Sequence, residues 1–220
     1  MNAGWSGSPE LGPLSLSAAD HVHLPPGSRA AFLDRDGTLN EAVPDPDSGM
    51  PESPLTLADV RLISGAADAA EQLMQAGYVL VCITNQPAAA KGKVTLRVLL
   101  EIHERVLDLL SAAGVRIELS LLCPHHPDPL EGELSRRCDC RKPAPGMLFQ
   151  AAAALDLDLG SSWMVGDTRA DVAAGRAAGC RTILIEYPPS AHKRGGEDRA
   201  DLLVPDLRRG VAQLLDHVRR

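Results

Sequence analysis

The sequence predicts an α/β fold, namely a three-layer, doubly wound parallel sheet with helices on both faces. Two observations lead to this fold class. From Ala30 onward, short apolar runs alternate with longer stretches of helical periodicity, which is the pattern of repeated strand–helix–strand units. Apolar residues make up 45% of the 220 residues, so the chain can bury the core of one domain. Right-handed crossovers between parallel strands then place helices on both sides of the sheet.

The individual elements follow from local patterns. The expected strands are short apolar or β-branched runs at 30–34, 79–84, 117–123, 162–166 and 182–185. The expected helices carry apolar residues at helical spacing over 66–77, 94–113, 145–156, 169–178 and 206–218. Gly77, Gly114 and Gly179 stop three of these helices, and Pro145 suits the first turn of another.

The chain is expected to divide into a tail and one domain. Residues 1–28 are rich in Gly, Ser and Pro without a sustained period, which predicts a flexible N-terminal tail. Residues 29–220 are then the folded domain. Within it, the proline-rich segment 41–57 is predicted to be a loop that forms a flap over one edge of the sheet.

Composition and charge indicate which kinds of partner the protein can bind and in which cellular compartment it is found. A net charge of −7 and an aromatic content of 3% disfavour binding to a phosphate backbone or stacking on bases, so no nucleic acid partner is expected. No charged start precedes an apolar stretch and no apolar run is long enough to cross a membrane. Five cysteines, an odd number, include a metal-like cluster, which indicates a reducing compartment. We therefore expect a cytoplasmic protein, and a monomer, that acts on a small molecule.

Polar residues gather where the predicted strands end. Each of four residues ends or directly follows an apolar run: Asp34, Thr84, Cys123 and Asp167. Because ligand sites in open parallel sheets lie outside the carboxyl ends of the strands, we expect these side chains to share one edge.

Two aspartates after the first strand predict a magnesium site for phosphoryl transfer. Asp34 and Asp36 are two residues apart, and Gly37 permits the tight bend that brings both carboxylates together. Crowded carboxylates repel unless a cation lies between them, and oxygen ligands suit Mg²⁺. Asp34 is the candidate nucleophile that forms an aspartyl-phosphate, and Asp36 the candidate acid/base for the leaving alcohol and the attacking water. The structural alternative is an acidic turn.

The run Asp34-Arg35-Asp36-Gly37-Thr38 resembles the first motif of the haloacid dehalogenase (HAD) superfamily of hydrolases. Segments that match the three later motifs follow in the expected order. The resemblance implies that Thr84 binds the phosphoryl group and that Lys142 neutralises charge in the transition state. It also implies that Asp167 joins Asp34 and Asp36 in the Mg²⁺ site. Asp171, one turn further on, is either part of this site or an orienting cap for the loop.

A second cluster predicts a structural zinc site. Its ligands are Cys123, His125, Cys138 and Cys140. Three thiolates and one imidazole form a closed tetrahedral set, which leaves no open position for water and therefore excludes zinc catalysis. His126 is the competing ligand, but His125 repeats the one-residue gap of the second pair. The zinc would pin a long loop and direct Arg141 and Lys142, which follow it.

The zinc cluster narrows the resemblance to the capless HAD branch that contains heptose bisphosphate and histidinol-phosphate phosphatases, in which a zinc-bound loop replaces a large cap domain. The resemblance implies hydrolysis of the 7-phosphate of D-glycero-D-manno-heptose 1,7-bisphosphate. It implies substrate contacts from Asn85, Gln86 and Arg141. Histidinol phosphate or another small sugar phosphate is the alternative substrate, and a catalytically silent zinc-stabilised binding module is the alternative outside enzymes.

The sequence departs from this branch at two positions that face the expected sugar. The glycine-containing segment that usually follows the second motif is replaced by Pro87-Ala88-Ala89-Ala90, after which Lys91 can take the basic role. Thr168 stands where the branch often has lysine, and Arg169 follows it. Lys91 and Arg169 are therefore added to the candidate substrate-binding residues.

Overall fold

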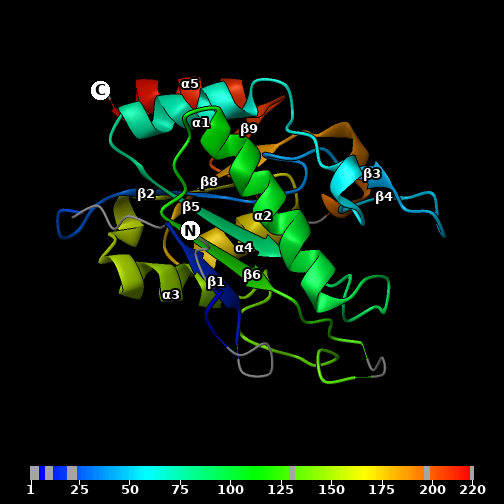
Figure 1. Ribbon diagram of the computed structural model, residues 1–220. Coiled ribbons are helices and arrows are strands. Elements are labelled where there is room, and N and C mark those ends of the chain that lie inside the picture. Colours follow the sequence, from blue (N-terminus) through cyan, green and yellow to red (C-terminus); the bar gives the residue numbers. More distant parts are fainter. Residues whose placement is uncertain (1–4, 8–11, 19–23, 129–131, 196–198, 219–220) are drawn as a thin grey trace.

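A seven-stranded sheet forms the centre of the computed structural model, which describes residues 5–7, 12–18, 24–128, 132–195 and 199–218 (Figure 1). The strands are β1 (Leu14–Ser17), β2 (Ala30–Leu33), β5 (Val79–Asn85), β6 (Leu119–Cys123), β7 (Trp163–Gly166), β8 (Arg181–Ile185) and β9 (Leu202–Val204). They are arranged in the order β1-β6-β5-β2-β7-β8-β9. Every neighbouring pair is parallel except β1 with β6, which is antiparallel.

Within the described residues, five α-helices cover the sheet in two layers. They are α1 (Ala66–Gln75), α2 (Leu96–Ala112), α3 (Gly146–Leu155), α4 (Arg169–Ala177) and α5 (Leu207–Val218). Helices α1, α2 and α5 pack on one face, and α3 and α4 pack on the other. None of these helices in the described part of the chain is long and apolar enough to cross a membrane. The predicted three-layer α/β fold is confirmed, and the expected elements begin and end within two residues of their predicted bounds.

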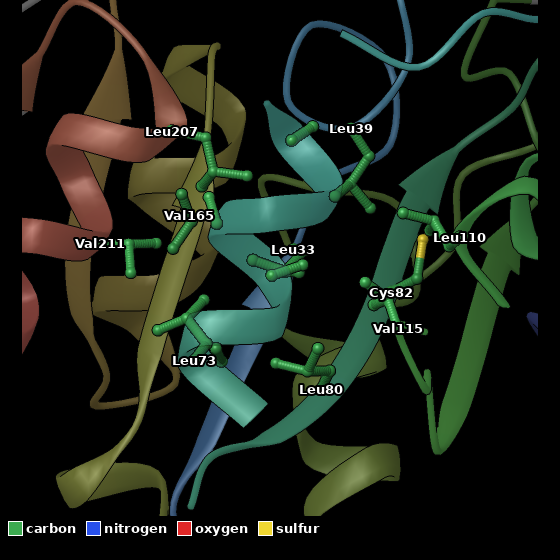
Figure 2. Close-up of a cluster of buried hydrophobic side chains, with 14 of the residues drawn as sticks. Leu33, Leu39, Leu73, Leu80, Cys82, Leu110, Val115, Val165, Leu207 and Val211 are labelled. Atoms are coloured by element: carbon green, nitrogen blue, oxygen red, sulfur yellow. The ribbon is translucent and has the colours of Figure 1, made fainter. Parts of the chain in front are cut away.

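Alternation along the strands divides the core between the two faces. Leu33 of β2 belongs to the cluster under α1, α2 and α5, whereas its neighbour Phe32 belongs to the cluster under α3 and α4. Figure 2 shows the first cluster, in which Leu73 of α1 and Val211 of α5 approach Leu33 and Val165. Because aromatic residues are scarce, most of the buried core residues are Leu, Val, Ile and Ala.

The parallel strands end at one edge and place the polar residues there. Asp34 directly follows β2, Asn85 ends β5, Cys123 ends β6 and Asp167 directly follows β7. The hydrogen bond from the Asp34 N–H to the Val165 carbonyl, at 2.9 Å, continues the pairing of β2 with β7 up to this edge. The site described below is therefore built on rigid elements.

Part of the N-terminal segment is ordered, which corrects the expectation of a flexible tail. Leu14–Ser17 forms the edge strand β1 on β6, and Leu14 and Leu16 are buried. Upstream, the Trp5 indole donates a 2.6 Å hydrogen bond to Glu104 on α2. The alternation of leucine with serine over only four residues is too short a signal to separate a strand from a loop. The domain therefore begins before residue 29.

The flap contains a short β-hairpin, which was not predicted because the proline content of this segment indicated a loop. Strands β3 (Val43–Pro44) and β4 (Pro51–Glu52) pair antiparallel. The buried carboxylate of Asp45 in this hairpin forms a salt bridge with Lys93, which lies beyond β5. This ion pair attaches the hairpin to the body of the domain beside the carboxyl edge of the sheet.

Candidate active site

A pocket of about 320 Å³ lies at the carboxyl edge of the sheet. Its floor is formed by polar residues that follow the central strands, including Asp34, Thr84 and Asp167. The flap contributes Glu52 and Ser53 to its wall. Of the four residues expected to share one edge of the sheet, Asp34, Thr84 and Asp167 line this cavity, whereas Cys123 belongs to the separate cysteine and histidine cluster.

Lys142 lies between two carboxylates at the bottom of this pocket. Its Nζ is 2.8 Å from Asp34 Oδ1 and 2.6 Å from Asp171 Oδ1. It also donates to the Ile83 carbonyl at 2.9 Å. Burial alone would lower the pKa of Lys142, but the two carboxylates hold that pKa above its usual range. Lys142 is therefore a fixed cation at the floor of the pocket.

Asn85 holds the main chain of Lys142. Its side-chain oxygen accepts the Lys142 N–H at 3.0 Å, and its amide nitrogen donates to the Lys142 carbonyl at 2.9 Å. Asn85 was predicted as a substrate contact. It does line the pocket, but both ends of its side chain are engaged in positioning Lys142.

Three carboxylates form a group that could hold a metal ion. Oxygen atoms of Asp34, Asp167 and Asp171 all lie within 4.8 Å of one another and are buried. Burial, and then the neighbouring carboxylates, raise the pKa of Asp34 to about 6 and that of Asp167 to about 8. Without a further cation, the lysine alone does not balance this negative charge.

The surroundings of Asp167 also fit a cation. Its Oδ1 is buried and has no hydrogen-bond partner within the described residues. Space beside it is kept open by Gly37, which has a φ of 86° and whose added Cβ would lie 2.1 Å from Asp167 Oδ2. A buried carboxylate oxygen without a partner is costly, and a divalent cation would remove that cost.

Asp171 caps helix α4, which is one of the two roles predicted from the sequence, and it also pairs with Lys142. Its Oδ2 accepts hydrogen bonds from the N–H and the hydroxyl of Thr168, at 3.0 and 2.6 Å, and so caps the start of α4. Its Oδ1 pairs with Lys142. One side chain thus joins the loop after β7 to the cation on the floor of the pocket.

The structure does not bring the carboxylate of Asp36 into the metal-binding group. Instead, donors surround it: the Arg35 guanidinium at 2.8 Å, Ser53 Oγ at 2.7 Å, Gln86 Nε2 at 2.6 Å and Asn40 Nδ2 at 3.0 Å. Burial would raise the pKa of Asp36, but the charge and hydrogen bonds of Arg35, followed by the other donors, lower it. The Asp36 carboxylate, which the sequence predicted to be a magnesium ligand, is therefore hydrogen-bonded to protein side chains instead.

Gln86 connects the first two motifs. Its amide nitrogen donates to Asp36 Oδ2 at 2.6 Å and to Thr84 Oγ1 at 2.9 Å. Gln86 is buried and is not among the residues that line the pocket, whereas Thr84 is. Gln86, which was predicted to contact the substrate, therefore lies behind Asp36 and Thr84.

Cations surround the mouth of the pocket. Lys91, Arg141 and Lys193 all line it. Glu52 of the flap lies between the two lysines, with Oε1 3.9 Å from Lys91 Nζ and Oε2 3.3 Å from Lys193 Nζ. Arg169, in contrast, is exposed outside the lining, and its Nη1 donates to the Gly195 carbonyl at 3.5 Å.

The cysteine and histidine residues of the second cluster converge as predicted from their spacing. Cys140 Sγ is 3.1 Å from Cys123 Sγ, 3.3 Å from Cys138 Sγ and 3.3 Å from His125 Nδ1. A tetrahedral zinc ion with Zn–S bonds of about 2.3 Å separates its sulfur ligands by about 3.8 Å. The four donors therefore need only a small expansion to fit zinc. His126 lies outside this group, beside Asp128.

The electrostatics of the four donors also favour a cation. The hydrogen bond from the Cys140 thiol stabilises the Cys123 thiolate and lowers the pKa of Cys123 to about 6. The same contact raises the pKa of Cys140. All three cysteines are free of disulfides. Zinc would allow every thiol to ionise, and the chain leads from Cys140 directly into Arg141 and Lys142.

Some residues of the site gave no signal in the sequence. Ser53 and Glu52 come from the flap, and Lys193 comes from the 3₁₀ helix Pro188–Lys193. Arg35 lies inside the first motif, but its burial behind Asp36 is set by the tertiary fold. The sequence showed only that Arg35 and Asp36 are adjacent along the chain.

Comparison with known proteins identifies relatives over most of the chain. A family model described as HAD-hydrolase-like matches residues 139–209. The chain is 37% identical over 178 residues to the D-glycero-beta-D-manno-heptose-1,7-bisphosphate 7-phosphatase of Yersinia pestis. The aligned region covers 81% of this chain and 90% of that protein. It is 39% identical over 179 residues to the enzyme of the same name from Pasteurella multocida, with coverages of 81% and 92%.

Solved structures that superpose on this chain include heptose bisphosphate phosphatases. The D,D-heptose 1,7-bisphosphate phosphatase from B. bronchiseptica, complexed with magnesium and phosphate, superposes with a TM-score of 0.72 at 30% identity and covers 86% of this chain and 99% of that one. The enzyme of the same name from Burkholderia thailandensis shares the fold, with a TM-score of 0.58 at 24% identity over 87% of this chain and 99% of that one.

Proposed function

Because the chain belongs to the D-glycero-beta-D-manno-heptose-1,7-bisphosphate 7-phosphatase family of HAD-like hydrolases, we propose that it removes the 7-phosphate from D-glycero-D-manno-heptose 1,7-bisphosphate. It is a phosphoric monoester hydrolase. The observation that carries the mechanism is the contact of Lys142 with Asp34 at the floor of the pocket. This contact places a cation beside a carboxylate where phosphorus would lie.

Asp34 is the proposed nucleophile. Its Oδ1 accepts hydrogen bonds from the Arg35 N–H and from Lys142, both at 2.8 Å. We assign the attack on phosphorus to Oδ2, the other oxygen of this carboxylate. The new Oδ2–P bond forms as the bond from phosphorus to the sugar oxygen breaks, which gives an aspartyl-phosphate. Lys142 and the Thr84 hydroxyl would bind the phosphoryl oxygens during this step.

Asp36 is the proposed acid and base. In the first step the protonated Asp36 carboxyl, a form that Arg35 disfavours in the substrate-free protein, gives its proton to the leaving sugar oxygen. In the second step the resulting carboxylate takes a proton from the water that attacks phosphorus, which restores the protonated form. That attack breaks the Oδ2–P bond, releases inorganic phosphate and restores Asp34. The hydrogen bonds from Arg35, Ser53 and Gln86 hold Asp36 in place for both transfers.

Asp34 and Asp167 would hold Mg²⁺, with Asp171 beside them. When bound, the ion would neutralise the carboxylate group and withdraw charge from the phosphoryl oxygens. Asp36, the third carboxylate ligand expected from the sequence, is hydrogen-bonded to the protein donors that surround it and is not assigned to the ion. The related B. bronchiseptica enzyme was solved with magnesium and phosphate, which supports magnesium as the ion.

The second phosphate of the substrate would bind at the mouth of the pocket. Lys91 and Lys193 both contact the carboxylate of Glu52, so the two ammonium groups already converge on one anionic group. Arg141, at the end of the zinc loop, supplies a third cation. Arg169 is not assigned to the substrate, because it lies outside the pocket lining.

Zinc would have a structural role here. Cys123, His125, Cys138 and Cys140 use all four tetrahedral positions, so the ion would bind no water for catalysis. Because Arg141 and Lys142 directly follow Cys140, fixing this loop also fixes two cations of the site.

The proposed partner is a small sugar phosphate rather than a nucleic acid. The net charge of −7 opposes a phosphate backbone, whereas the cations at the pocket mouth suit a compact bisphosphate. We propose a monomer as the working form. Three thiol ligands support a reducing location, and we therefore propose the cytoplasm.

Phosphate release with Mg²⁺ tests this function on both anomers of heptose 1,7-bisphosphate, on histidinol phosphate and on fructose 1,6-bisphosphate. Preference for a heptose anomer is expected. Exclusive turnover of histidinol phosphate would move the enzyme to that substrate. Asp34→Asn should abolish turnover while the protein stays folded, and activity in this variant would exclude Asp34 as the nucleophile.

A further inference from the structure

A buried chain of polar groups leads away from Asp36 on the side opposite the substrate. Arg35 is fully buried, and its guanidinium contacts Asp36 through Nε at 3.2 Å and Nη2 at 2.8 Å. Its Nη1 lies 3.4 Å from Nδ1 of His103 on α2. Nε2 of His103 lies 2.6 Å from the hydroxyl of Ser120 on β6. The chain connects the acid/base with two elements that do not touch the substrate pocket.

The direction of each hydrogen bond in this chain is fixed by chemistry. A guanidinium can only donate, so Nδ1 of His103 must accept from Arg35. The hydrogen of the neutral ring is then on Nε2 and is donated to Ser120. Burial, and then the charge of Arg35, lower the pKa of His103 to about 3, which keeps the imidazole neutral. His103 is therefore an acceptor with a defined tautomer.

The N-terminal segment closes the outer side of this chain. The Trp5 ring lies edge-on to His103 with a centroid separation of 5.4 Å and an interplanar angle of 62°. Its indole is held by Glu104, the neighbour of His103 on α2. A buried arginine needs partners for its donors, because an unsatisfied buried charge is expensive. His103 supplies such a partner on the side of Arg35 that faces away from Asp36.

We propose that His103 is a positioning residue for the phosphatase reaction: it fixes the Arg35 guanidinium and, through it, orients the Asp36 carboxylate toward the leaving oxygen. The inference rests on the acid/base role proposed for Asp36. Ser120 and Trp5 hold the imidazole in place. Without His103, Arg35 would turn to find another acceptor, and Asp36 would turn with it.

The leaving group distinguishes positioning of the acid from general loss of structure. A sugar alkoxide needs a proton in order to leave, whereas p-nitrophenolate leaves as a stable anion. Loss of a well-placed general acid costs about 10²–10⁴-fold, so misplacement should cost about tenfold. His103→Leu should therefore lower kcat for the sugar phosphate about tenfold, with little change in KM, and should lower kcat for p-nitrophenyl phosphate far less.

Rescue provides the second readout. His103→Asn keeps an oxygen near the position of Nδ1 as an acceptor for Arg35, and it should recover most of the selective loss. His217→Leu is the matched control, because His217 also packs edge-on against a tryptophan, Trp163, at 6.2 Å. The control should leave the ratio of the two activities unchanged.

Several outcomes would overturn the proposal. Equal losses on both substrates, no loss, or no rescue by asparagine would each exclude positioning by His103. If His103→Leu does not fold, Ser120→Ala removes the hydrogen-bond partner of Nε2 and so loosens the imidazole with a smaller change, and an unaltered activity ratio would then refute the idea. If the wild type hydrolyses no heptose phosphate, the proposed substrate is wrong. The effect of His103→Leu can then be compared on phenyl phosphate, whose leaving group needs a proton, and on p-nitrophenyl phosphate, whose leaving group does not. Failure of the proposed substrate and failure of the proposed role of His103 therefore remain distinguishable.

Discussion

Replacing Asn85 by alanine separates positioning from substrate binding. The side chain of Asn85 makes two hydrogen bonds with the main chain of Lys142, and Lys142 is 3% exposed. Asn85→Ala leaves a buried N–H and a buried carbonyl without partners. Each such group costs about 1–3 kcal/mol, so the free energy of unfolding should fall by about 2–6 kcal/mol.

The catalytic consequence follows from the same contacts. A displaced Lys142 would stabilise the phosphoryl group less well in the transition state, so kcat should fall at least about tenfold, which corresponds to about 1.4 kcal/mol. KM should change little, because Asn85 is engaged with Lys142 rather than with the substrate. Asn85→Asp is the matched variant, since it keeps the acceptor for the Lys142 N–H and loses only the donor.

Urea unfolding and steady-state kinetics measure both effects. The expected order of stability is wild type, then Asn85→Asp, then Asn85→Ala, with kcat in the same order. A variant of unchanged stability that has a raised KM would refute this reasoning. It would return Asn85 to the substrate-binding role predicted from the sequence.

Three further predictions address the metals and the second phosphate. The pKa values of Asp34 and Asp167 are raised to about 6 and about 8, so the native metal-free protein binds more protons than the unfolded chain. Its free energy of unfolding should therefore fall as pH rises from about 4 to 8. Thermal melts should show a larger increase in melting temperature on addition of Mg²⁺ at pH 8 than at pH 5. Cys138→Ser should lose zinc in a metal assay and lower both the melting temperature and kcat, whereas unchanged zinc content would refute the ligand set. Lys193→Gln should lower kcat/KM for the bisphosphate relative to the 7-monophosphate, Glu52→Gln should raise that ratio, and equal effects on both substrates would contradict a second-phosphate site.

The sequence predicted the fold well because its signals are local. Strand β5 is an apolar run rich in β-branched residues, and helix α2 repeats leucines at helical spacing, so each element could be located without its neighbours. The edge strands were missed for the opposite reason. Strand β1 has only four residues, and β9 (Leu202–Val204) has three, so pairing with β6 and β8 defines them rather than propensity.

The motifs located the chemical residues but not their partners. Asp34, Lys142 and Asp167 meet as expected, because each lies at the carboxyl edge of the sheet. The side chains of Asn85 and Gln86, however, point to Lys142 and to Asp36. Spacing along the chain shows that residues reach one edge, but it does not show which hydrogen-bond partner each of them finds there.

Strand β1 has a consequence for solubility and for truncation of this protein. It is the antiparallel neighbour of β6, so it covers main-chain groups that would otherwise lie open at the margin of a parallel sheet. Exposed strand margins promote association between chains. A chain shortened to begin at residue 29 would keep every motif of the HAD superfamily, yet it would expose β6 from Leu119 to Leu122 and lose the Trp5 contact with α2. Trimming what resembles a dispensable leader would therefore yield an enzyme prone to self-association.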